Sequence, residues 1–305
     1  MKIERKPHWL QKKANMKEQA EMRRLLGELE LNTVCQQALC PNIAECFSCG
    51  QATFLILGKD CTRQCSFCNV EKGGIPQPPD ADEPRRVAEA VLRLKLSHVV
   101  ITSPTRDDLP DGGAGHYAAT VRAVRLASPR TAVELLAPDF QGDRLALATV
   151  LAVAPDILAH NVETVPRLYG VRSGADYARS LELLRRVTEG WPDIPLKSGI
   201  MLGLGETLEE VRAVLGDLHS VGCSYLSIGQ YLAPSRRHQP VVEFVRPELF
   251  DALRQYALAL GFSHVESGPY VRSSYHAADY TKNETGTFLA GLVTTGSPSD
   301  QSGVG

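Results

Sequence analysis

Seven of the eight cysteines of this 305-residue chain lie between residues 35 and 68, and six of them form two groups of three. The groups have the spacings Cys35-x4-Cys40-x5-Cys46 and Cys61-x3-Cys65-x2-Cys68. Each group is one thiolate short of a closed four-cysteine site. A soft metal centre with three protein thiolates keeps one position free for a substrate, a cofactor or an unusual fourth ligand. Two such centres in one chain indicate chemistry, so we expect an enzyme.

The composition indicates where in the cell this chemistry takes place and which partners it excludes. With 43% hydrophobic residues, the chain can bury a substantial core. Residues 1–17 are basic and lack the apolar run of a signal peptide, and no segment approaches the roughly 20 apolar residues that span a bilayer. We therefore expect a cytoplasmic protein, monomeric by default, that contacts no membrane. A net charge of -2 without a long basic stripe argues against a nucleic-acid partner.

Two other uses of the clustered cysteines compete with an open metal centre. Disulfide pairing is disfavoured because cytoplasmic thiols are kept reduced. A structural zinc ion needs four protein ligands, and no histidine or fourth cysteine follows the second group at a suitable distance. Cys49 and Cys223 fall outside both groups, and we interpret them as ordinary free cysteines, although Cys49 lies close enough to the first group to confuse its ligand assignment.

Beyond the first cysteine group, short apolar runs alternate with helical patterns. We predict strands at residues 53–57, 98–103, 132–136, 157–161, 195–202 and 224–229. Between them we predict helices at residues 83–96, 114–126, 142–153, 173–188 and 207–218, the last opening with the capping box Thr207-x-x-Glu210. This alternation builds an α/β parallel sheet, which right-handed crossovers can curl into a partial (β/α)6 TIM-like barrel. An open doubly wound sheet fits the same pattern.

The second cysteine group follows the first of these strands, in the segment GKDCTRQCSFCNV at residues 58–70. With the aromatic Phe67 before Cys68, it resembles the signature of the radical S-adenosylmethionine (SAM) superfamily. The resemblance implies a [4Fe-4S] cluster on Cys61, Cys65 and Cys68 whose open iron chelates the amino and carboxylate groups of SAM. Reduction of that cluster cleaves the sulfonium and yields a 5'-deoxyadenosyl radical.

The first cysteine group resembles the auxiliary-cluster motif of the lipoyl synthase family. It lies in TVCQQALCPNIAEC at residues 33–46, and six further segments match the blocks of that family in the correct order. They are KPHWL at 6–10, ITS at 101–103 with RDDL at 106–109 and DGGA at 111–114, HNVETV at 160–165, PLKSG at 195–199, GQYL at 229–232 and VRSSYH at 271–276. No single block decides the family, but seven in order are highly specific.

The resemblance to this family also implies which residue is the fourth ligand of the first cysteine group. It implies that Ser274 ligates an auxiliary [4Fe-4S] cluster together with Cys35, Cys40 and Cys46. A hard serine alkoxide on a centre that prefers soft thiolate should be displaced easily. We hypothesise that Ser274 leaves during turnover so that a bridging sulfide can be given up, and that Arg272 favours the alkoxide form. An exposed Arg-Ser-Ser turn is the plain alternative.

The resemblance also implies the domain organisation. Residues 1–50 form an N-terminal extension with the auxiliary-cluster cysteines, and residues 51–235 form the partial barrel. Residues 236–280 form a C-terminal extension with the serine ligand, and residues 281–305 form a disordered tail that is rich in Gly, Ser and Thr from Thr294.

The implied activity is insertion of two sulfur atoms at C6 and C8 of an octanoyl chain attached to a lysine of a carrier protein. No acid, base or nucleophile activates these C–H bonds, whereas a radical does. The auxiliary cluster is the implied sulfur donor. Implied partners are an octanoylated H protein or 2-oxoacid dehydrogenase lipoyl domain, and a low-potential electron donor such as ferredoxin or flavodoxin. The alternatives are another sulfur-inserting radical enzyme, such as a methylthiotransferase or a biotin-synthase-like protein, and an iron-sulfur carrier or electron-transfer protein.

Several polar residues at strand ends are candidates for binding SAM. The motif Gly199-x-Met201-x-Gly203-x-x-Glu206 resembles the adenine-side motif of the superfamily, although a simple chain reversal explains it equally well. Lys197 is a charged residue inside a buried strand, and we favour a cofactor contact over an internal ion pair. The further candidates at strand ends are Thr102, Ser103, Asn161 and Glu163.

The chain departs from the family pattern at Pro104-Thr105, where valine and an acidic or amide residue are usual. We expect this change to reshape the loop beside the cofactor. The residues Arg106-Asp107-Asp108 that follow it remain intact.

Overall fold

The computed structural model describes residues 7–10, 18–49 and 51–281. Its centre is an eight-stranded sheet in the order β1-β2-β5-β6-β7-β8-β9-β10. Neighbouring strands from β2 onward pair in parallel, and β1 pairs antiparallel with β2. The strands are β1 Asn32–Thr33, β2 Thr53–Leu55, β5 His98–Thr102, β6 Ala132–Leu136, β7 Ile157–Ala159, β8 Leu196–Leu202, β9 Tyr225–Gln230 and β10 His264–Gly268.

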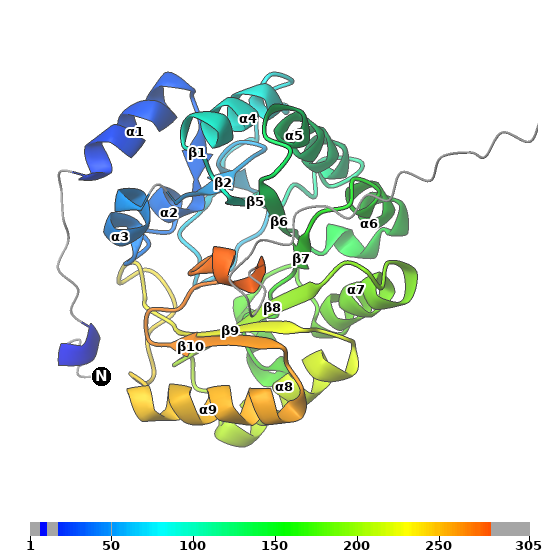
Figure 1. The fold of residues 1–305 in the computed structure, drawn as a ribbon. Helices are drawn as coiled ribbons and strands as arrows, with labels where there is room; N and C mark the ends of the chain where they lie inside the picture. Colours follow the sequence, from blue (N-terminus) through cyan, green and yellow to red (C-terminus); the bar gives the residue numbers. More distant parts are fainter. Residues whose placement is uncertain (1–6, 11–17, 50, 282–305) are drawn as a thin grey trace, which may run out of the picture.

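Helices surround this sheet on its outer side, and the sheet curls without closing (Figure 1). The outer helices are α4 Glu83–Arg93, α5 Ala114–Ala127, α6 Arg144–Leu151, α7 Tyr177–Gly190, α8 Leu208–Ser220 and α9 Pro247–Leu260. The N-terminal helices α1 Glu18–Glu28, α2 Val34–Gln37 and α3 Ile43–Ser48 lie beside β1 and β2. Single 3-10 turns occur at η1 His8–Leu10, η2 Phe140–Gly142, η3 Pro166–Val171 and η4 Ala277–Thr281.

The alternating architecture predicted from the sequence is confirmed. Each of the six predicted strands and five predicted helices has a counterpart within a few residues, and the sheet forms a partial barrel instead of an open doubly wound sheet. The Thr207-x-x-Glu210 capping box is present at the start of α8. Val211, Leu215 and Leu218 of that helix are buried in the core, and their spacing places them on one apolar face of the helix.

The sheet continues past the residues that the sequence assigned to the barrel. Strand β1 lies in the predicted N-terminal extension, and β10 with α9 lies in the predicted C-terminal extension. Both β1 and β10 pair with the central strands, so the two extensions are attached to the barrel through its sheet. The predicted division at residues 50, 235 and 280 stays a prediction, and the predicted tail at 281–305 lies almost entirely outside the described residues. In the described part of the chain, no helix has the length and apolar character that crossing a bilayer requires.

An ion pair buried among the strands corrects one expectation from the sequence. Lys197 on β8 is fully buried, and its Nζ lies 3.0 Å from Oε1 of Glu134 on β6, which is also fully buried. Glu134 in addition lies 3.2 Å from Nε2 of His98, and Nζ sits 3.8 Å from the centre of the Tyr280 ring. Although burial would raise it, the pKa of Glu134 is held below its ordinary value by Lys197 and His98. The expected cofactor contact of Lys197 is therefore wrong, because its charge is already neutralised within the sheet.

Removing only one partner of this pair should leave an uncompensated buried charge. We expect Lys197→Met to lower the free energy of unfolding by about 3 to 5 kcal/mol, as measured by urea denaturation. The double variant Lys197→Met/Glu134→Leu should recover most of that loss, because it removes both charges. A single variant as stable as the parent would contradict this account.

Candidate active site

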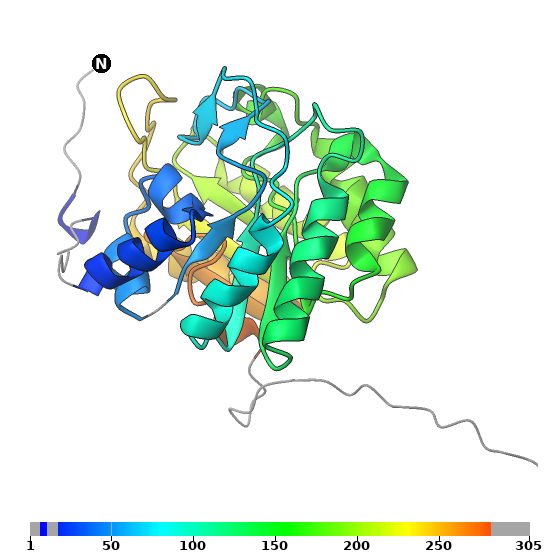
Figure 2. The same ribbon diagram turned by 90° about the horizontal axis from the view of Figure 1, so that it is seen from above.

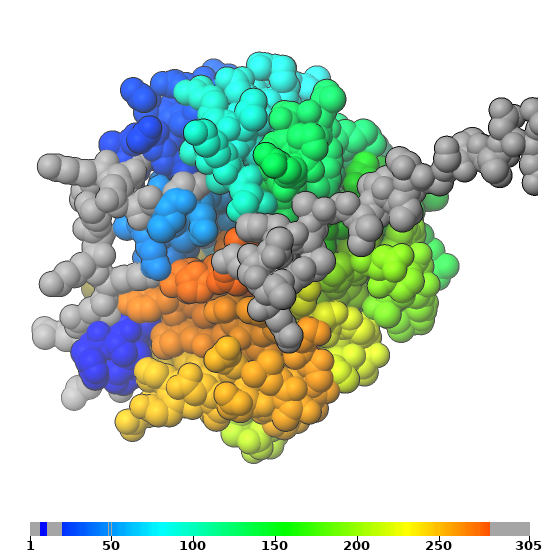
Figure 3. All heavy atoms as spheres, viewed as in Figure 1, coloured from blue at the N-terminus to red at the C-terminus, as the bar shows by residue number. Residues whose placement is uncertain are grey.

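The first cysteine group lines a cavity together with residues from the other end of the chain. Cys35 lies in the short helix α2, which Thr33 caps by accepting a hydrogen bond from the Gln36 backbone N–H. The cavity has a volume of about 150 Å³, and its wall includes the predicted donors Cys35, Cys40, Cys46 and Ser274, together with Arg272. Residues 272–278 lie beside α3, as Figures 1 and 3 show for the C-terminal segment of the described chain. The predicted ligands are thus brought together across more than two hundred residues.

The chemistry of this wall fits an iron-sulfur group. None of the eight cysteines, all of which lie in the described residues, forms a disulfide, so the disulfide alternative is not realised. Burial, with a smaller contribution from the neighbouring Cys40, raises the pKa of the Cys35 thiol to about 11. The described residues contain no group of three or more His, Cys, Asp or Glu side chains that could hold a single metal ion; the four donors surround a cavity instead. Cys49 lines the same cavity from the C-terminal end of α3.

The second cysteine group occupies the loop that follows β2, as predicted. The loop is bounded by the two-residue strands β3 Asp60–Cys61 and β4 Glu71–Lys72, which pair with each other. Burial raises the pKa of Cys68 to about 11 and also raises that of Cys65, and Cys61 contributes to both shifts. The three thiols are therefore close enough to interact. In Figure 2 this loop and the loop after β9 project from the same end of the barrel, and the Gln239 backbone N–H donates to Ser66 O at 3.0 Å.

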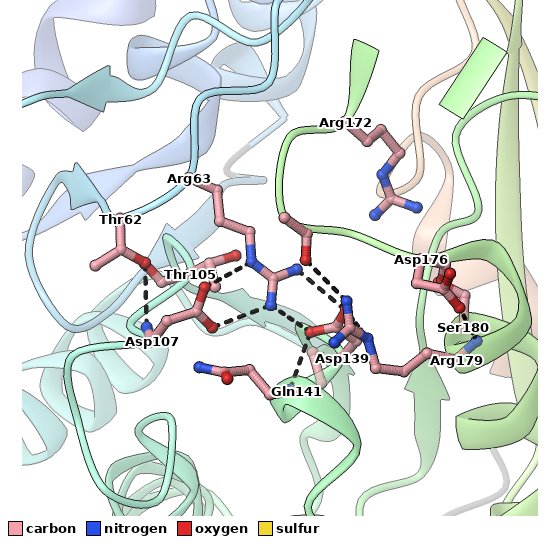
Figure 4. Close-up of polar contacts among 12 residues, drawn as sticks. Thr62, Arg63, Thr105, Asp107, Asp139, Gln141, Arg172, Asp176, Arg179 and Ser180 are labelled. Atoms are coloured by element: carbon pink, nitrogen blue, oxygen red, sulfur yellow. Dashed lines mark hydrogen bonds and ion pairs between the residues drawn. The ribbon is translucent and has the colours of Figure 1, made fainter. Parts of the chain in front are cut away.

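Arg63, inside the cysteine loop, anchors that loop to the barrel through two carboxylates (Figure 4). Its Nε lies 2.8 Å from Oδ2 of Asp107, and its Nη2 lies 2.6 Å from Oδ1 of Asp139. The arginine side chain is 7% exposed and that of Asp139 is 1% exposed, so the charges neutralise each other away from water. Although burial would raise it, the pKa of Asp139 is held below its ordinary value by Arg63. The sequence analysis missed Arg63 and Asp139.

The segment Arg106-Asp107-Asp108 holds the first half of the cysteine loop at two points. Arg106, which is 1% exposed, donates from Nη1 to Leu57 O at the start of the loop, while Asp107 holds Arg63 further along. The backbone N–H of Thr62 also donates to Thr105 O at 3.0 Å. Thr105, one of the two residues at which the chain departs from the family pattern, therefore acts through its backbone carbonyl. Its hydrogen bond with Thr62 keeps the cysteine loop attached to the barrel.

A larger cavity of about 350 Å³ adjoins the first one and shares Cys35, Cys40, Thr53, Arg272 and Ser274 with it. Its wall also includes Cys68 from the second cysteine group and the predicted SAM-binding residues Asn161 and Glu163. The structure thus brings one thiol of the second group, all but one of the proposed auxiliary ligands and two predicted cofactor contacts to one space.

Asn161 and Glu163 connect this space to the C-terminal segment. Ser273 Oγ donates to Asn161 Oδ1 at 3.2 Å, and Asn161 Nδ2 donates to Glu163 Oε1 at 3.0 Å. Glu163 has a left-handed φ of 65°, a conformation that costs free energy and that concentrates at functional sites. Burial raises the pKa of Glu163, and Arg172 and the Asn161 hydrogen bond oppose that rise.

The C-terminal segment reaches the cavity because Gly229 has no side chain. A Cβ atom at Gly229 would lie 2.1 Å from Val271 O, which no real Cβ contact shows. The GQYL block of the sequence therefore makes room for the VRSSYH block.

Other predicted cofactor contacts lie away from this space. Thr102 Oγ1 donates to Leu136 O, and Ser103 Oγ accepts from the Tyr117 hydroxyl. Glu206 accepts from the backbone N–H groups of Gly203 and Leu204, so it stabilises the turn before α8. None of these predicted contacts lines the larger cavity. In contrast, Gly199 and Met201, which belong to the same predicted adenine-side motif as Gly203 and Glu206, do line it. For Gly203 and Glu206, the chain-reversal alternative describes what the structure contains.

Arg172 is a further charged residue that sequence reasoning missed. Its Nη1 donates to Val162 O and to the Tyr169 hydroxyl, while its buried Nε has no hydrogen-bond partner among the described residues. Its charge acts on both Cys65 and Glu163. The Nε–H group of Arg172 is thus a buried donor without a partner in the described chain, near Cys65 and Glu163. Such a donor is suited to bind an anionic ligand that the chain itself does not supply.

Comparisons with known proteins agree with this geometry. Residues 55–218, more than half of the chain, match the family model of the radical SAM superfamily. The chain is 78% identical to the lipoyl synthase of Trichlorobacter lovleyi over 280 residues, which cover 92% of this chain and 100% of that protein. It is 64% identical to the lipoyl synthase of Geobacter sulfurreducens over 304 residues, which cover 100% of this chain and 99% of that protein.

Solved structures of low sequence identity share the fold alone. Methylornithine synthase matches with a TM-score of 0.52 and 15% identity, over 70% of this chain and 69% of that chain. The Streptococcus suis protein SuiB bound to S-adenosylmethionine matches with a TM-score of 0.53 and 11% identity, over 82% of this chain and 60% of that chain.

Loss of the Arg63 guanidinium should release the second cysteine loop. We expect Arg63→Met to retain less iron than the parent after anaerobic reconstitution, because Cys61, Cys65 and Cys68 lose the anchor of their loop. Iron and sulfide analysis measures this loss. Arg185→Met, which removes an exposed arginine ion pair on α7, is the matched control and should retain the parent content. Equal iron content in the Arg63 variant would contradict the anchoring role.

Buried His160 should make the fold sensitive to acid. Its Nδ1–H donates to Ala137 O, and burial, with the charge of Arg172, lowers its pKa to about 4. The unfolded chain takes up this proton near pH 6.5 but the folded chain does not, so stability falls as the pH drops from 6.5 toward 4. We expect the parent to lose about 2 to 3 kcal/mol more than His160→Gln over this window in urea denaturation. The exposed His219→Gln is the control, and identical pH profiles for parent and His160→Gln would refute the assignment.

Proposed function

The chain belongs to the lipoyl synthase family of the radical SAM superfamily, and we propose that its two cysteine groups and Ser274 hold the two clusters of its reaction. The reaction inserts two sulfur atoms, at C6 and C8, into an octanoyl chain bound to a carrier lysine. The observation that carries the proposal is the cavity lined by Cys35, Cys40, Cys46 and Ser274, which adjoins the space lined by Cys68, Asn161 and Glu163.

The division of labour between the two groups follows from their positions. When bound, a [4Fe-4S] cluster at Cys61, Cys65 and Cys68 would supply the electron that cleaves SAM, and one at Cys35, Cys40, Cys46 and Ser274 would supply the sulfur. The protein's contribution is to position the reactants: both groups contribute to the larger cavity, and an octanoyl chain in that space would lie between them.

Asn161, Glu163 and Arg172 are the residues that we propose to hold the methionine part of SAM. The carboxylate of Glu163 can accept from the amino group of SAM, and the guanidinium of Arg172 can donate to its carboxylate. The unpartnered Nε of Arg172 and the left-handed backbone of Glu163 support this assignment. Asn161 orients Glu163 through its Nδ2.

Ser274 and Arg272 are the residues that we propose to control release of sulfur. Both line the cavity of the first cysteine group. Arg272 lies close enough to Cys40 and Glu163 for their charges to oppose the lowering of its pKa by burial. Its positive charge beside Ser274 would stabilise a serine alkoxide, while the hard oxygen ligand stays easier to displace than a thiolate.

The protein partners follow from the reaction. The substrate is an octanoylated carrier, for which we propose an H protein or the lipoyl domain of a 2-oxoacid dehydrogenase. We propose a ferredoxin or a flavodoxin as the low-potential electron donor, and a monomer as the working form. We propose the cytoplasm as its location, because none of the eight cysteines of the described chain is paired in a disulfide, as expected in a reducing compartment.

The test combines the activity with a variant of Ser274. Anaerobic protein is incubated with SAM, a low-potential reductant and an octanoyl-lysyl peptide, and mass spectrometry should detect two added sulfurs in the peptide. Ser274→Ala should still produce 5'-deoxyadenosine but lose sulfur insertion at least tenfold, because it removes a ligand of the sulfur source only. The exposed Ser220→Ala on α8 is the control.

Two outcomes would count against the proposal. Unchanged sulfur insertion by Ser274→Ala would remove the assigned role of that residue. No sulfur gain in the parent with about eight irons per chain would leave the iron-sulfur carrier alternative. A single added sulfur, or sulfur added only to another substrate, would favour a different sulfur-inserting radical enzyme.

A further inference from the structure

A hydroxyl group on strand β2 contacts Ser274 directly. Thr53 is 3% exposed, and its Oγ1 donates a hydrogen bond to Ser274 Oγ at 2.7 Å, across a sequence separation of 221 residues. Thr53 lines both the cavity of the first cysteine group and the larger cavity beside it. A buried hydroxyl of a strand more often bonds to backbone than to another side chain, so this long-range pairing of two hydroxyls needs an explanation.

Thr53 also contacts a second residue of the same proposed site. Burial raises the pKa of Cys35, and hydrogen bonds with the backbone and the side chain of Thr53 oppose that rise. The pairing of Thr33 with Phe54 in the antiparallel β1–β2 ladder explains the contact, because the chain that leaves β1 toward Cys35 runs beside the start of β2. One threonine therefore meets two of the four donors, and these two come from opposite ends of the chain.

The segment that carries Ser274 is held at two points. Thr53 of β2 binds Ser274, and Asn161, which follows β7, binds the adjacent Ser273. Two neighbouring hydroxyls are thus fixed by side chains from well-separated strands of the barrel. Such a two-point attachment limits both the position and the rotation of the segment, which an exposed Arg-Ser-Ser turn would not need.

We propose that Thr53 is a positioning residue for the Ser274 ligand: its hydroxyl holds Ser274 Oγ beside Cys35, so that the fourth donor is in place when the auxiliary cluster binds. This inference rests on the proposed function, because it assumes that Ser274 is a cluster ligand. Without the Thr53 hydroxyl, Ser274 would have to be ordered at the moment of binding, and the cluster would be held less firmly.

The experiment isolates the auxiliary site and follows it without turnover. In the background Cys61→Ala/Cys65→Ala/Cys68→Ala, only the first cysteine group can load, and the protein should take up about four irons on anaerobic reconstitution. The measured quantities are the iron content, the electron paramagnetic resonance spectrum of the reduced cluster and the rate at which a chelator removes iron. Four further substitutions are compared in this background.

Thr53→Val keeps the shape of the side chain and removes the hydroxyl, and we expect iron loss to accelerate about five- to tenfold, with an altered spectrum. Thr53→Ser keeps the hydroxyl and should restore the parent rate and spectrum. Thr120→Val is the matched control, because Thr120 is a buried threonine of α5 that donates to His116 O in its own helix, away from both cavities. It should leave iron loss unchanged.

The fourth substitution tests whether Thr53 acts through Ser274. In a Ser274→Ala background, Thr53→Val should cause a much smaller further acceleration, because the hydroxyl then has only Cys35 left to contact. An equal acceleration with and without Ser274 would assign Thr53 a general structural role and overturn the proposal. A parent-like rate and spectrum for Thr53→Val would overturn it as well.

The design separates failure of this inference from failure of the proposed function. If the triple-cysteine background takes up no iron, or if Ser274→Ala leaves its spectrum unchanged, Ser274 is not a ligand and both proposals fall. If Ser274→Ala alters the spectrum and Thr53→Val does not, only the role of Thr53 is refuted.

Discussion

The contact on which the candidate site most depends is the buried ion pair between Arg63 and two carboxylates. A loop with three cysteines has few apolar side chains to pack, so a polar anchor helps to give it a defined position. Arg63 supplies that anchor by meeting Asp107 after β5 and Asp139 after β6, two successive strand ends of the barrel. Because Asp139 is almost fully buried, the pair exists only while the barrel around it is intact. The geometry of the thiols and the packing of the sheet are therefore coupled.

The central strands and helices could be predicted because their signal is local. Residues 98–102 and 132–136 are short apolar runs, and α8 carries both a capping box and one apolar face. Strand β10 gave no such signal: Val265 is its one fully apolar residue, and its neighbours are a histidine, a glutamate, a serine and a glycine. It joins the sheet through five parallel backbone pairs with β9, a tertiary preference that its side chains do not encode.

Within the candidate site, the sequence predicted which donor residues come together, but it did not predict the residues that support them. The cysteine spacing and the family blocks pointed to Ser274, and the structure places it beside Cys35 and Cys40. Thr53 and Arg63 were missed because each acts through a partner distant in sequence. Arg172 was missed because only the fold brings its charge near Cys65. Lys197 shows the opposite error, since a charge in a strand predicts a partner but not whether that partner is a cofactor or Glu134 on a neighbouring strand. A signal for Asp139 did exist, because it follows a predicted strand in the same way as Asn161 follows the next one.

The long separation between Thr53 and Ser274 has a consequence for how the protein is made. The loop with Cys61, Cys65 and Cys68 is anchored by residues up to 139, all of which leave the ribosome well before Ser274 does. The other site stays incomplete until the chain has been synthesised past β10, because its fourth donor follows that strand. Synthesis from the N-terminus thus imposes an order on the two sites. Cys35, Cys40 and Cys46 are synthesised before the other cysteines, yet their site is completed last, when Ser274 has been synthesised. Their thiols are exposed to oxidation and to other metal ions during that delay.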